Sequence, residues 1–320
     1  MKAPALLCPG QGAQTVGMGR DLAETYPAAG RVFREANEAL GVELDRLCFE
    51  GPIEELSRSD VSQPAIVTVS VAALRAMAEA TGKPVPVGAA AGLSLGEYTA
   101  LVAAGVLEFT DAVRLVRRRG TFMQEACETN PGAMYSVIGL EDAQVEEACA
   151  RVRETTGGRV WPANYNSPGQ LVISGETEAA EAAADLCTEA GARRAIRLNV
   201  AGAFHTEMMQ PAADRLRPLL HAVPMRSPRC AVVANVTARP VDEPDEIRDL
   251  LERQVTNPVR WTDSMRWLAA QGCRECYEVG PGRVLQGLLK RTDRAIGCQS
   301  IGTAEDVQAY ARQQAAGATD

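Results

Sequence analysis

The stretch from Val85 to Ala104, VPVGAAAGLSLGEYTALVAA, decides the fold of this 320-residue chain. Val85–Gly92 is small and apolar and predicts a central strand, whereas Leu95–Leu107 is rich in alanine and predicts a helix. Between them, Gly92–Gly96 (GLSLG) fits the G-x-S-x-G pattern of a sharp turn from strand to helix, in which glycines avoid side-chain clashes. We therefore expect an α/β fold with Ser94 exposed at a helix N-terminus.

Apolar runs alternate with helical patterns along most of the chain, which favours the same α/β architecture. Further strands are expected at Ala3–Cys8, Cys230–Asn235 and Cys276–Val279. Further helices are expected at Val61–Ala80, at Asp111–Glu125 and after Gly282. Thr110 is expected to cap the second of these helices. The tail Val307–Asp320 is expected to be partly helical and loosely held.

The middle of the chain has a different pattern. Strands and helices follow the order β-α-β-β-α-β over Gly132–Leu140, Ala143–Val152, Val160–Asn164, Gln170–Ser174, Glu176–Ala190 and Ala195–Val200. This order is that of the ferredoxin-like split motif. We therefore expect a small inserted subdomain at residues 128–199 and a large subdomain that combines residues 1–127 and 200–320.

The composition, with 46% hydrophobic and 23% charged residues, is that of a globular protein and excludes a disordered chain. The net charge of −8 argues against a nucleic-acid partner. The longest stretches without charged residues, Ala3–Gly19 and Val160–Gly175, are interrupted by Gly, Pro, Gln or Asn and predict no membrane span. The N-terminal apolar run is too short for a signal peptide, so we expect a cytoplasmic protein.

The nine cysteines are scattered and odd in number, which does not suit a disulfide framework. Cys273 and Cys276 have CxxC spacing, but the chain has no second CxxC and no histidine near them. A structural zinc site needs four ligands. We therefore expect no metal site and interpret these thiols as small buried side chains.

A nucleophilic serine needs a base, and the chain has only two histidines. His221 lies at the end of an expected helix, where the helix dipole stabilises a histidine. His205 lies in an apolar, Gly-containing loop after a strand, and such loops often carry catalytic residues. We expect His205 to be the base of Ser94. No Asp or Glu stands out in a comparable loop, and a backbone carbonyl could hold the imidazole instead. The alternatives are a plain tight turn at Ser94 and a backbone-bonded loop histidine.

Arg119 is predicted on the apolar face of the helix at Asp111–Glu125. Its neighbours three or four residues away are Leu115, Val116, Phe122 and Met123. A buried guanidinium is costly unless it is paired. Its partner is either an internal carboxylate or a substrate carboxylate, which matches the forked donors of arginine. The pattern leaves both alternatives open.

Seven sequence blocks connect the chain to a known family. They are Pro9–Gln14, Gly92–Tyr98, Arg119–Gly120 with Met123–Gln124, Asn164–Gln170, Gly202–His205, Gln254–Pro258 and Glu278–Gly282. With these blocks in order over roughly residues 3–305, the chain resembles the malonyl-CoA:acyl carrier protein transacylases, acyltransferases of fatty-acid and polyketide synthesis. The resemblance implies an α/β-hydrolase-like large subdomain with an inserted ferredoxin-like small subdomain and an active site between them.

The resemblance also implies roles for the matching residues. Ser94 would be the acylated nucleophile, His205 its general base and acid, and Arg119 the clamp for the free carboxylate of malonyl. The substrates would be malonyl-CoA and holo acyl carrier protein, which react in turn with the serine. No metal or bound cofactor would be required.

Further roles, one departure and one expectation about selectivity follow from the same resemblance. The main-chain N–H groups of Gln11 and Leu95 would form the oxyanion hole, and a backbone carbonyl near Gln254 would orient the base. Many relatives carry a histidine where Leu93 stands, so a hydrogen bond from that position is absent here. Phe204 fits malonyl-selective relatives, because its ring would crowd a methyl-branched substrate.

Three alternative functions remain open at this point. A serine thioesterase or other hydrolase would use the same turn, a polyketide acyltransferase would use the same reaction, and a non-catalytic subunit would only dock a carrier protein. A free-standing chain favours fatty-acid synthesis.

Carrier proteins in this pathway are usually acidic, so a basic docking site is implied. The candidates are Arg193, Arg194 and Arg197, or Arg283, Lys290 and Arg291, with ordinary solvated surfaces as the alternative.

Overall fold

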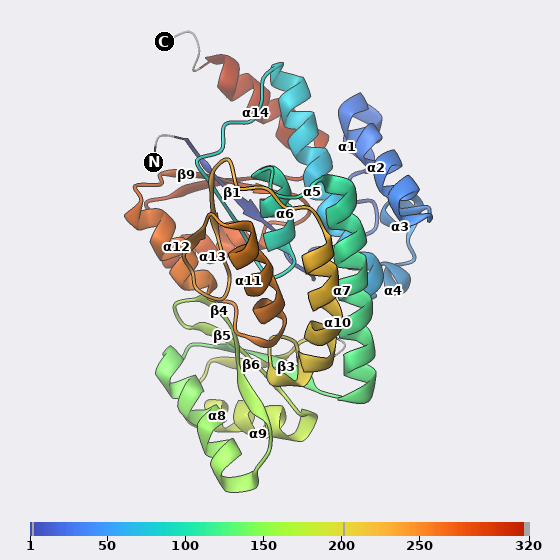
Figure 1. The fold of residues 1–320 in the computed structure, drawn as a ribbon. Helices are drawn as coiled ribbons and strands as arrows, with labels where there is room; N and C mark the ends of the chain where they lie inside the picture. Colours follow the sequence, from blue (N-terminus) through green and yellow to red (C-terminus); the bar gives the residue numbers. More distant parts are fainter. Residues whose placement is uncertain (2, 201, 317–320) are drawn as a thin grey trace.

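The computed structural model describes residues 1, 3–200 and 202–316 and has two parts, each built around its own sheet (Figure 1). The larger part contains a six-stranded sheet and the smaller part a four-stranded sheet. The strands of the larger sheet are β1 (Ala5–Cys8), β2 (Ala89–Gly92), β7 (Ala231–Val233), β8 (Pro240–Val241), β9 (Glu275–Val279) and β10 (Gly297–Ile301). The smaller part is inserted in sequence between β2 and β7.

The larger sheet has the strand order β10-β9-β1-β2-β7-β8. All neighbouring pairs are parallel except β7 and β8, which are antiparallel. Because the carboxyl ends of parallel strands meet at one edge, the loops that follow them gather there. These loops carry Gln11 after β1, Ser94 after β2 and Asn235 after β7.

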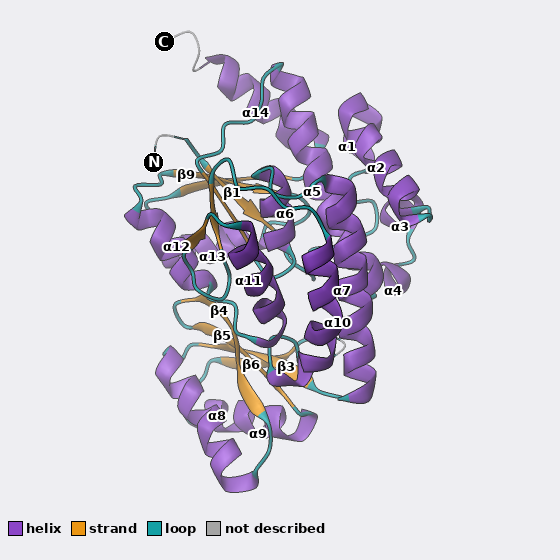
Figure 2. Cartoon of the chain, viewed as in Figure 1, coloured by secondary structure: helices purple, strands orange, loops and turns teal. Residues whose placement is uncertain are grey.

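Helices cover both faces of the larger sheet (Figure 2). They are α1 (Arg20–Thr25), α2 (Pro27–Leu40), α3 (Leu44–Glu50), α4 (Ile53–Leu56), α5 (Ser59–Thr81), α6 (Gly96–Ala103), α7 (Phe109–Thr129), the short 3₁₀ helix η1 (Glu207–Met209), α10 (Gln210–Ala222), α11 (Pro244–Thr256), α12 (Trp261–Ala270), α13 (Val284–Thr292) and α14 (Ala304–Ala316). By length and composition alone α5 could cross a membrane, but 78% of its most apolar window is buried inside the protein. It is therefore explained as a core helix.

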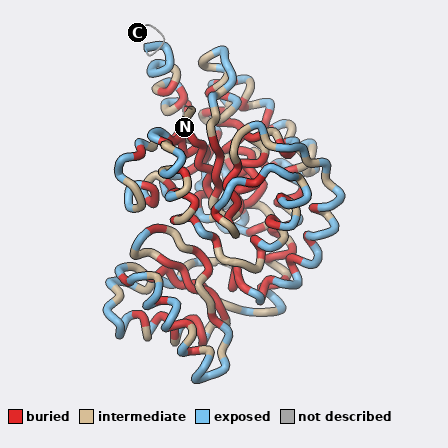
Figure 3. The backbone as a smooth tube through the Cα atoms, turned by 60° about the vertical axis from the view of Figure 1, so that its left-hand side comes forward, coloured by how far each residue is buried: buried red, intermediate tan, exposed pale blue. Residues whose placement is uncertain are grey.

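Side chains of β1 alternate between two separate cores, as the two-residue period of a strand requires. Leu6 and Cys8 lie in one core with residues of α5 and α7. Leu7 lies in the other core, with residues of α12 and α13. Figure 3 shows the result as a band of buried chain through the middle of the larger part. The loops at the strand ends are thereby fixed to a rigid base.

The smaller part has the strands β3 (Ala133–Ile138), β4 (Val160–Ser167), β5 (Gln170–Gly175) and β6 (Arg194–Arg197), and the helices α8 (Asp142–Thr156) and α9 (Thr177–Glu189). Its strand order is β4-β5-β3-β6, with all neighbours antiparallel. This arrangement confirms the predicted ferredoxin-like motif. The predicted subdomain boundaries at residues 128 and 199 stay a prediction.

The smaller sheet uses its two faces differently. Tyr135 and Ile173 pack in a core with α8 and α9. Met134 and Val172, on the opposite face, belong to the main core of the larger part and line the cavity described below. One face therefore stabilises the smaller part, and the other forms a wall between the two parts.

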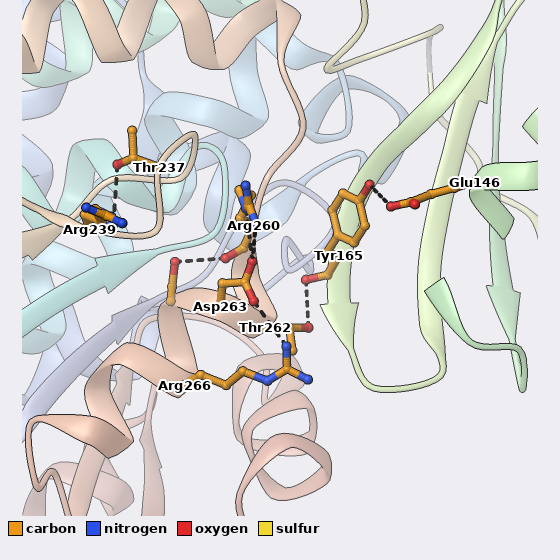
Figure 4. Close-up of polar contacts among 9 residues, drawn as sticks. Glu146, Tyr165, Thr237, Arg239, Arg260, Thr262, Asp263 and Arg266 are labelled. Atoms are coloured by element: carbon orange, nitrogen blue, oxygen red, sulfur yellow. Dashed lines mark hydrogen bonds and ion pairs between the residues drawn. The ribbon is translucent and has the colours of Figure 1, made fainter. Parts of the chain in front are cut away.

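Main-chain and side-chain contacts join β4 to the segment that leads into α12. The N–H of Tyr165 donates to the carbonyl of Val259 at 2.9 Å, and the N–H of Val259 donates to the carbonyl of Ala163 at 2.8 Å. Figure 4 shows the next contact, in which Thr262 Oγ1 donates to the carbonyl of Tyr165, while the Tyr165 hydroxyl donates to Glu146. The contacts of Val259 and Thr262 fix the smaller part against the larger one, and the bond to Glu146 joins β4 to α8 within the smaller part.

Two local predictions are wrong. Thr110 does not cap α7, because the helix already begins at Phe109, whose buried ring anchors the first turn. The tail is not loosely held over its described part, because Val307 and Tyr310 of α14 are buried and the ring of Tyr310 packs 5.3 Å from that of Tyr277. Residues 317–320 lie outside the described residues.

Candidate active site

Ser94 stands in the turn between β2 and α6 with a φ of 51°, in the left-handed region. The two flanking glycines are required by close approach. A Cβ on Gly92 would lie 1.9 Å from the main-chain carbon of Gly96, and a Cβ on Gly96 would lie 2.0 Å from the carbonyl oxygen of Cys8. The G-x-S-x-G pattern therefore has a steric cause at both ends, and it holds the serine in a strained turn.

Asn235, which the sequence did not indicate, braces this turn from the end of β7. Its Oδ1 accepts the main-chain N–H of Ser94 at 2.7 Å, and its Nδ2 donates to the carbonyl of Gly92 at 2.7 Å. A single side chain therefore spans the turn. It also occupies the N–H of Ser94, which leaves other N–H groups to stabilise an oxyanion.

His205 reaches Ser94 from the loop after β6. Its Nε2 lies 2.8 Å from Ser94 Oγ, and its Nδ1 lies 2.8 Å from the main-chain carbonyl of Gln254. A carbonyl oxygen only accepts, so Nδ1 carries the proton and Nε2 is free to accept the serine proton. No carboxylate among the described residues is hydrogen-bonded to the ring. The backbone carbonyl thus takes the place of a triad acid.

The imidazole of His205 is 4% exposed. Burial lowers its pKa to about 4, and the positive charge of Arg119 acts in the same direction, while hydrogen bonds to the backbone partly oppose them. A pKa near 4 keeps the ring neutral at physiological pH. His205 is therefore in the state that a general base requires.

Arg119 enters from α7 and is 1% exposed, as its place on the apolar face predicts. Its Nη1 donates to Gln63 Oε1 at 2.9 Å, and its Nη2 donates to Gln254 Oε1 at 3.0 Å and to Ser94 Oγ at 3.1 Å. No described carboxylate lies within ion-pair distance of it, although the charge of the nearby Glu97 acts on it and its guanidinium lies 5.7 Å from the centre of the Tyr98 ring. Of the two predicted alternatives, an internal carboxylate in direct contact with Arg119 is not found among the described residues.

These residues line a cavity of about 520 Å³ between the two parts of the molecule. The larger part contributes Gln11, Leu93, Ser94, Arg119, Phe204, His205, Val284 and Leu288, among others. The smaller part contributes Met134, Asn164, Asn166, Gln170 and Val172. The volume suits a small-molecule substrate. An acyl group on Ser94 would lie beside the guanidinium of Arg119 in a cavity that Phe204 also lines.

The two residues predicted for the oxyanion hole, Gln11 and Leu95, differ in their relation to the cavity. Gln11 lines the cavity, and its side chain is hydrogen-bonded to Ser59 and Gln63. Leu95 follows Ser94 directly, and its side chain is buried away from the cavity. Neither main-chain N–H forms a hydrogen bond within the described part of the chain. Both groups are available to a bound oxygen.

Sequence reasoning missed a set of buried polar residues behind the nucleophile. The Nε2 of Gln254 donates to Glu97 Oε2 at 2.6 Å and to the carbonyl of Ser94 at 2.9 Å. Burial raises the pKa of Glu97 to about 7, although the hydrogen bonds from Gln254 and from the main-chain N–H of Asn235, and the charge of Arg119, lower it in part. The available signal was the place of Glu97, the one charged residue of α6, three positions after Ser94.

The chain was compared with known proteins. The family model described as the acyl transferase domain matches residues 5–318, nearly the whole chain. The chain belongs to the acyl transferase family. Among its relatives is the malonyl CoA-acyl carrier protein transacylase of Escherichia coli, 49% identical over 90% of this chain and 92% of that protein. The protein of the same name from Bacillus subtilis is 42% identical over 96% of both chains.

Solved structures agree with this acyl transferase assignment. An acyl carrier protein S-malonyltransferase from Vibrio cholerae superposes with a TM-score of 0.91 at 43% identity, covering 95% of this chain and 98% of that one. A malonyl-transacylase solved in complex with a holo acyl carrier protein of a type II polyketide synthase gives a TM-score of 0.93 at 42% identity, covering 98% and 100%. The predicted large and small subdomain architecture is therefore confirmed.

Proposed function

We propose that this acyl transferase moves the malonyl group of malonyl-CoA to the pantetheine thiol of holo acyl carrier protein. The observation that carries the proposal is the guanidinium of Arg119, buried 3.1 Å from the Ser94 hydroxyl without a carboxylate partner among the described residues. A buried cation beside a nucleophile selects an acyl group that brings its own carboxylate. Relatives at 42–49% identity carry the name of this activity.

In the first half-reaction the Ser94 oxygen bonds to the thioester carbonyl carbon while its proton passes to Nε2 of His205. The carbonyl electrons move to the oxygen, and the tetrahedral intermediate then expels coenzyme A as its C–S bond breaks. The leaving sulfur takes the proton back from His205. Malonyl is now an ester of Ser94, with its free carboxylate held by Arg119.

In the second half-reaction the pantetheine thiol gives its proton to His205 and attacks the malonyl ester. The C–O bond to Ser94 breaks, and Ser94 recovers its proton from the imidazole. The main-chain N–H groups of Gln11 and Leu95 stabilise the oxyanion in both halves, each contributing about 3 kcal/mol to the lowering of the barrier. The carbonyl of Gln254 keeps the imidazole in the required tautomer throughout.

A basic hollow beside the active-site cavity is the proposed docking site for the carrier protein. Arg193 and Arg194 at the start of β6 and Arg291 of α13 line one hollow of about 430 Å³, although they are far apart in sequence. Arg291 also donates to Gln170, which lines the active-site cavity. Residues from both docking candidates of the sequence thus line one hollow. An acidic carrier protein is attracted there, next to the route that its pantetheine arm must enter.

The other basic residues predicted for docking do not line the hollow. Arg283 forms an ion pair with Asp306 and does not line the hollow, and neither do Lys290 and Arg197. We therefore leave them out of the proposed docking site.

We place the protein in the cytoplasm and in fatty-acid synthesis. A polyketide pathway is the alternative, since a relative of polyketide synthesis is equally similar in structure.

The proposal is tested by intact mass spectrometry after brief exposure to malonyl-CoA, with Ser94→Ala as the matched control. We expect a malonyl adduct on the wild-type protein, none on Ser94→Ala, and loss of the adduct when holo acyl carrier protein is added. The malonyl group should then be found on the carrier protein.

Two other results would replace the proposal. An adduct that disappears equally fast in buffer and with carrier protein would identify a hydrolase, in which water resolves the acyl-enzyme. No adduct with any acyl-CoA would support a non-catalytic docking subunit. Leu93, which lines the cavity where many relatives carry a histidine, would then be the first residue to change.

A further inference from the structure

A buried carboxylate behind the nucleophile has no place in the reaction described so far. Glu97 lies in the first turn of α6 and is 3% exposed. Its Oε2 accepts from Nε2 of the Gln254 side chain at 2.6 Å and from the main-chain N–H of Asn235 at 3.2 Å. A buried carboxylate is costly, so its retention here calls for an explanation.

Both partners of Glu97 act directly on the reacting groups. Gln254 accepts from Nη2 of Arg119 through Oε1 and from His205 through its main-chain carbonyl. Asn235 braces the two sides of the turn that carries Ser94. One carboxylate oxygen therefore joins the end of β7 to α11 immediately behind the nucleophile.

The donor and acceptor ends of the Gln254 side-chain amide allow only one orientation of this group. Nε2 of Gln254 only donates, and it lies among acceptors, namely Glu97 Oε2 and the carbonyl of Ser94. Oε1 only accepts, and it faces the guanidinium of Arg119. If the Gln254 amide were flipped by 180°, its N–H groups would face the guanidinium of Arg119 and its oxygen would face the carboxylate of Glu97. Both contacts would be repulsive. Glu97 supplies the shortest of the contacts that prevent this rotation.

We infer that Glu97 is a positioning residue, which fixes the Gln254 amide and thereby holds Arg119 where it meets the carboxylate of the acyl group. The inference deepens the proposed function and rests on it for its kinetic test. Glu97 touches neither substrate nor the reacting atoms. Its effect is therefore expected in the preference for a carboxylate-bearing acyl group, because that preference depends on Arg119.

The kinetic test is the ratio of kcat/KM for loading Ser94 with malonyl-CoA and with acetyl-CoA. Glu97→Leu removes the acceptor and should lower this ratio about tenfold, as expected for one lost charge-assisted hydrogen bond. Glu97→Gln is the matched control, because its amide oxygen can still accept from Gln254, and it should retain the wild-type ratio within about twofold. In an Arg119→Ala background, Glu97→Leu should not change the ratio further.

The inference is overturned if Glu97→Leu keeps the wild-type ratio, or if it lowers the ratio equally in the Arg119→Ala background. Should Glu97→Leu fail to fold, Glu97→Asp replaces it, since a side chain shorter by one carbon withdraws the oxygen from Gln254 and should also lower the ratio. An unchanged ratio in Glu97→Asp would overturn the inference as well.

A crystal structure of the variant separates this inference from the proposed function, because it needs no substrate. The Gln254 amide and the Arg119 guanidinium should both be displaced in Glu97→Leu and unmoved in Glu97→Gln. Unmoved side chains in Glu97→Leu would reject the positioning role. A wild-type protein that does not load malonyl would reject the proposed function, while the crystal structure would still decide the role of Glu97.

Discussion

The main-chain carbonyl of Gln254 lies 2.8 Å from Nδ1 of His205, in the place where a serine triad usually has a carboxylate. A carbonyl orients the ring but brings no negative charge to stabilise an imidazolium. The side chain of the same glutamine contacts Arg119 at 3.0 Å. One residue thus connects the base to the cation. The hydrogen bond from the imidazole to the carbonyl favours the protonated ring, but burial and the positive charge of Arg119 outweigh it and lower the pKa of His205.

The first prediction concerns the titration of His205. Its pKa of about 4 lies below the ordinary 6.5, so the ring should stay neutral, and loading of Ser94 should stay active, when the pH falls to 5.5. A ring with the ordinary pKa would be only about one-tenth neutral at that pH. The measurement is the ring signal of His205 by NMR in a His221→Gln variant, which leaves a single histidine. Arg119→Ala should raise the midpoint.

The lowered pKa of His205 also affects the free energy of unfolding. Between pH 6.5 and 4 the unfolded chain binds a proton at this histidine that the folded protein does not. His205 should therefore reduce the free energy of unfolding as the pH falls through this window, and His205→Gln should lose less stability over it. A ring midpoint close to 6.5 would contradict both statements.

The second prediction concerns Arg119. Arg119→Ala should reduce malonyl loading about a hundredfold more than acetyl loading, because only malonyl offers a carboxylate to the forked donors. The quantity to compare is the ratio of malonyl to acetyl loading rates. Acetyl loading should fall too, because Arg119 also donates to Ser94 Oγ. The control is Arg118→Ala, an exposed neighbour on α7, which should leave both rates unchanged. Equal losses for the two acyl groups would count against the clamp.

The positions of Ser94, His205 and Arg119 could be predicted because each depends on a short-range rule. The turn at Ser94 needs two glycines, Arg119 follows from helical periodicity, and His205 was selected from only two histidines. The split motif was predictable for the same reason, because its strands and helices are bounded by clear turns. These features are local, so a single sequence displays them.

Features that depend on distant contacts could not be predicted. Asn235 is 141 residues from Ser94, and nothing near it in sequence indicates that its amide braces the turn. Polar strand β10 was not predicted, since its burial is decided by the neighbouring strand β9 rather than by its own pattern. Helices α1 to α4 were not predicted either, although the buried residues of α2, Ala29, Val32, Phe33 and Ala36, have helical spacing, so α2 is a local signal that was missed. Glu97 was overlooked because an acidic residue in the first turn of a helix is ordinarily explained by the helix dipole.

The third prediction concerns Phe204, whose buried ring lines the cavity beside His205. Phe204→Ser should increase loading with methylmalonyl-CoA relative to malonyl-CoA about tenfold, because the space of the ring becomes available to the extra methyl group. The measurement is the competition between the two acyl-CoAs for Ser94 in wild type and variant. If the wild-type protein already loads methylmalonyl-CoA as fast as malonyl-CoA, the ring does not select the substrate.

The last prediction concerns the basic hollow formed by Arg193, Arg194 and Arg291. The double variant Arg194→Glu, Arg291→Glu should raise the KM for holo acyl carrier protein about tenfold or more and leave the KM for malonyl-CoA unchanged, because reversed charges repel an acidic protein that approaches this face. The wild-type KM for the carrier protein should rise with salt, and that of the variant should not. Arg312→Glu is the matched control, since it reverses an exposed charge on α14, far from the smaller part (Figure 1). An equal change in both KM values would place coenzyme A rather than the carrier protein in the hollow, and no change in either would exclude the hollow as the docking site.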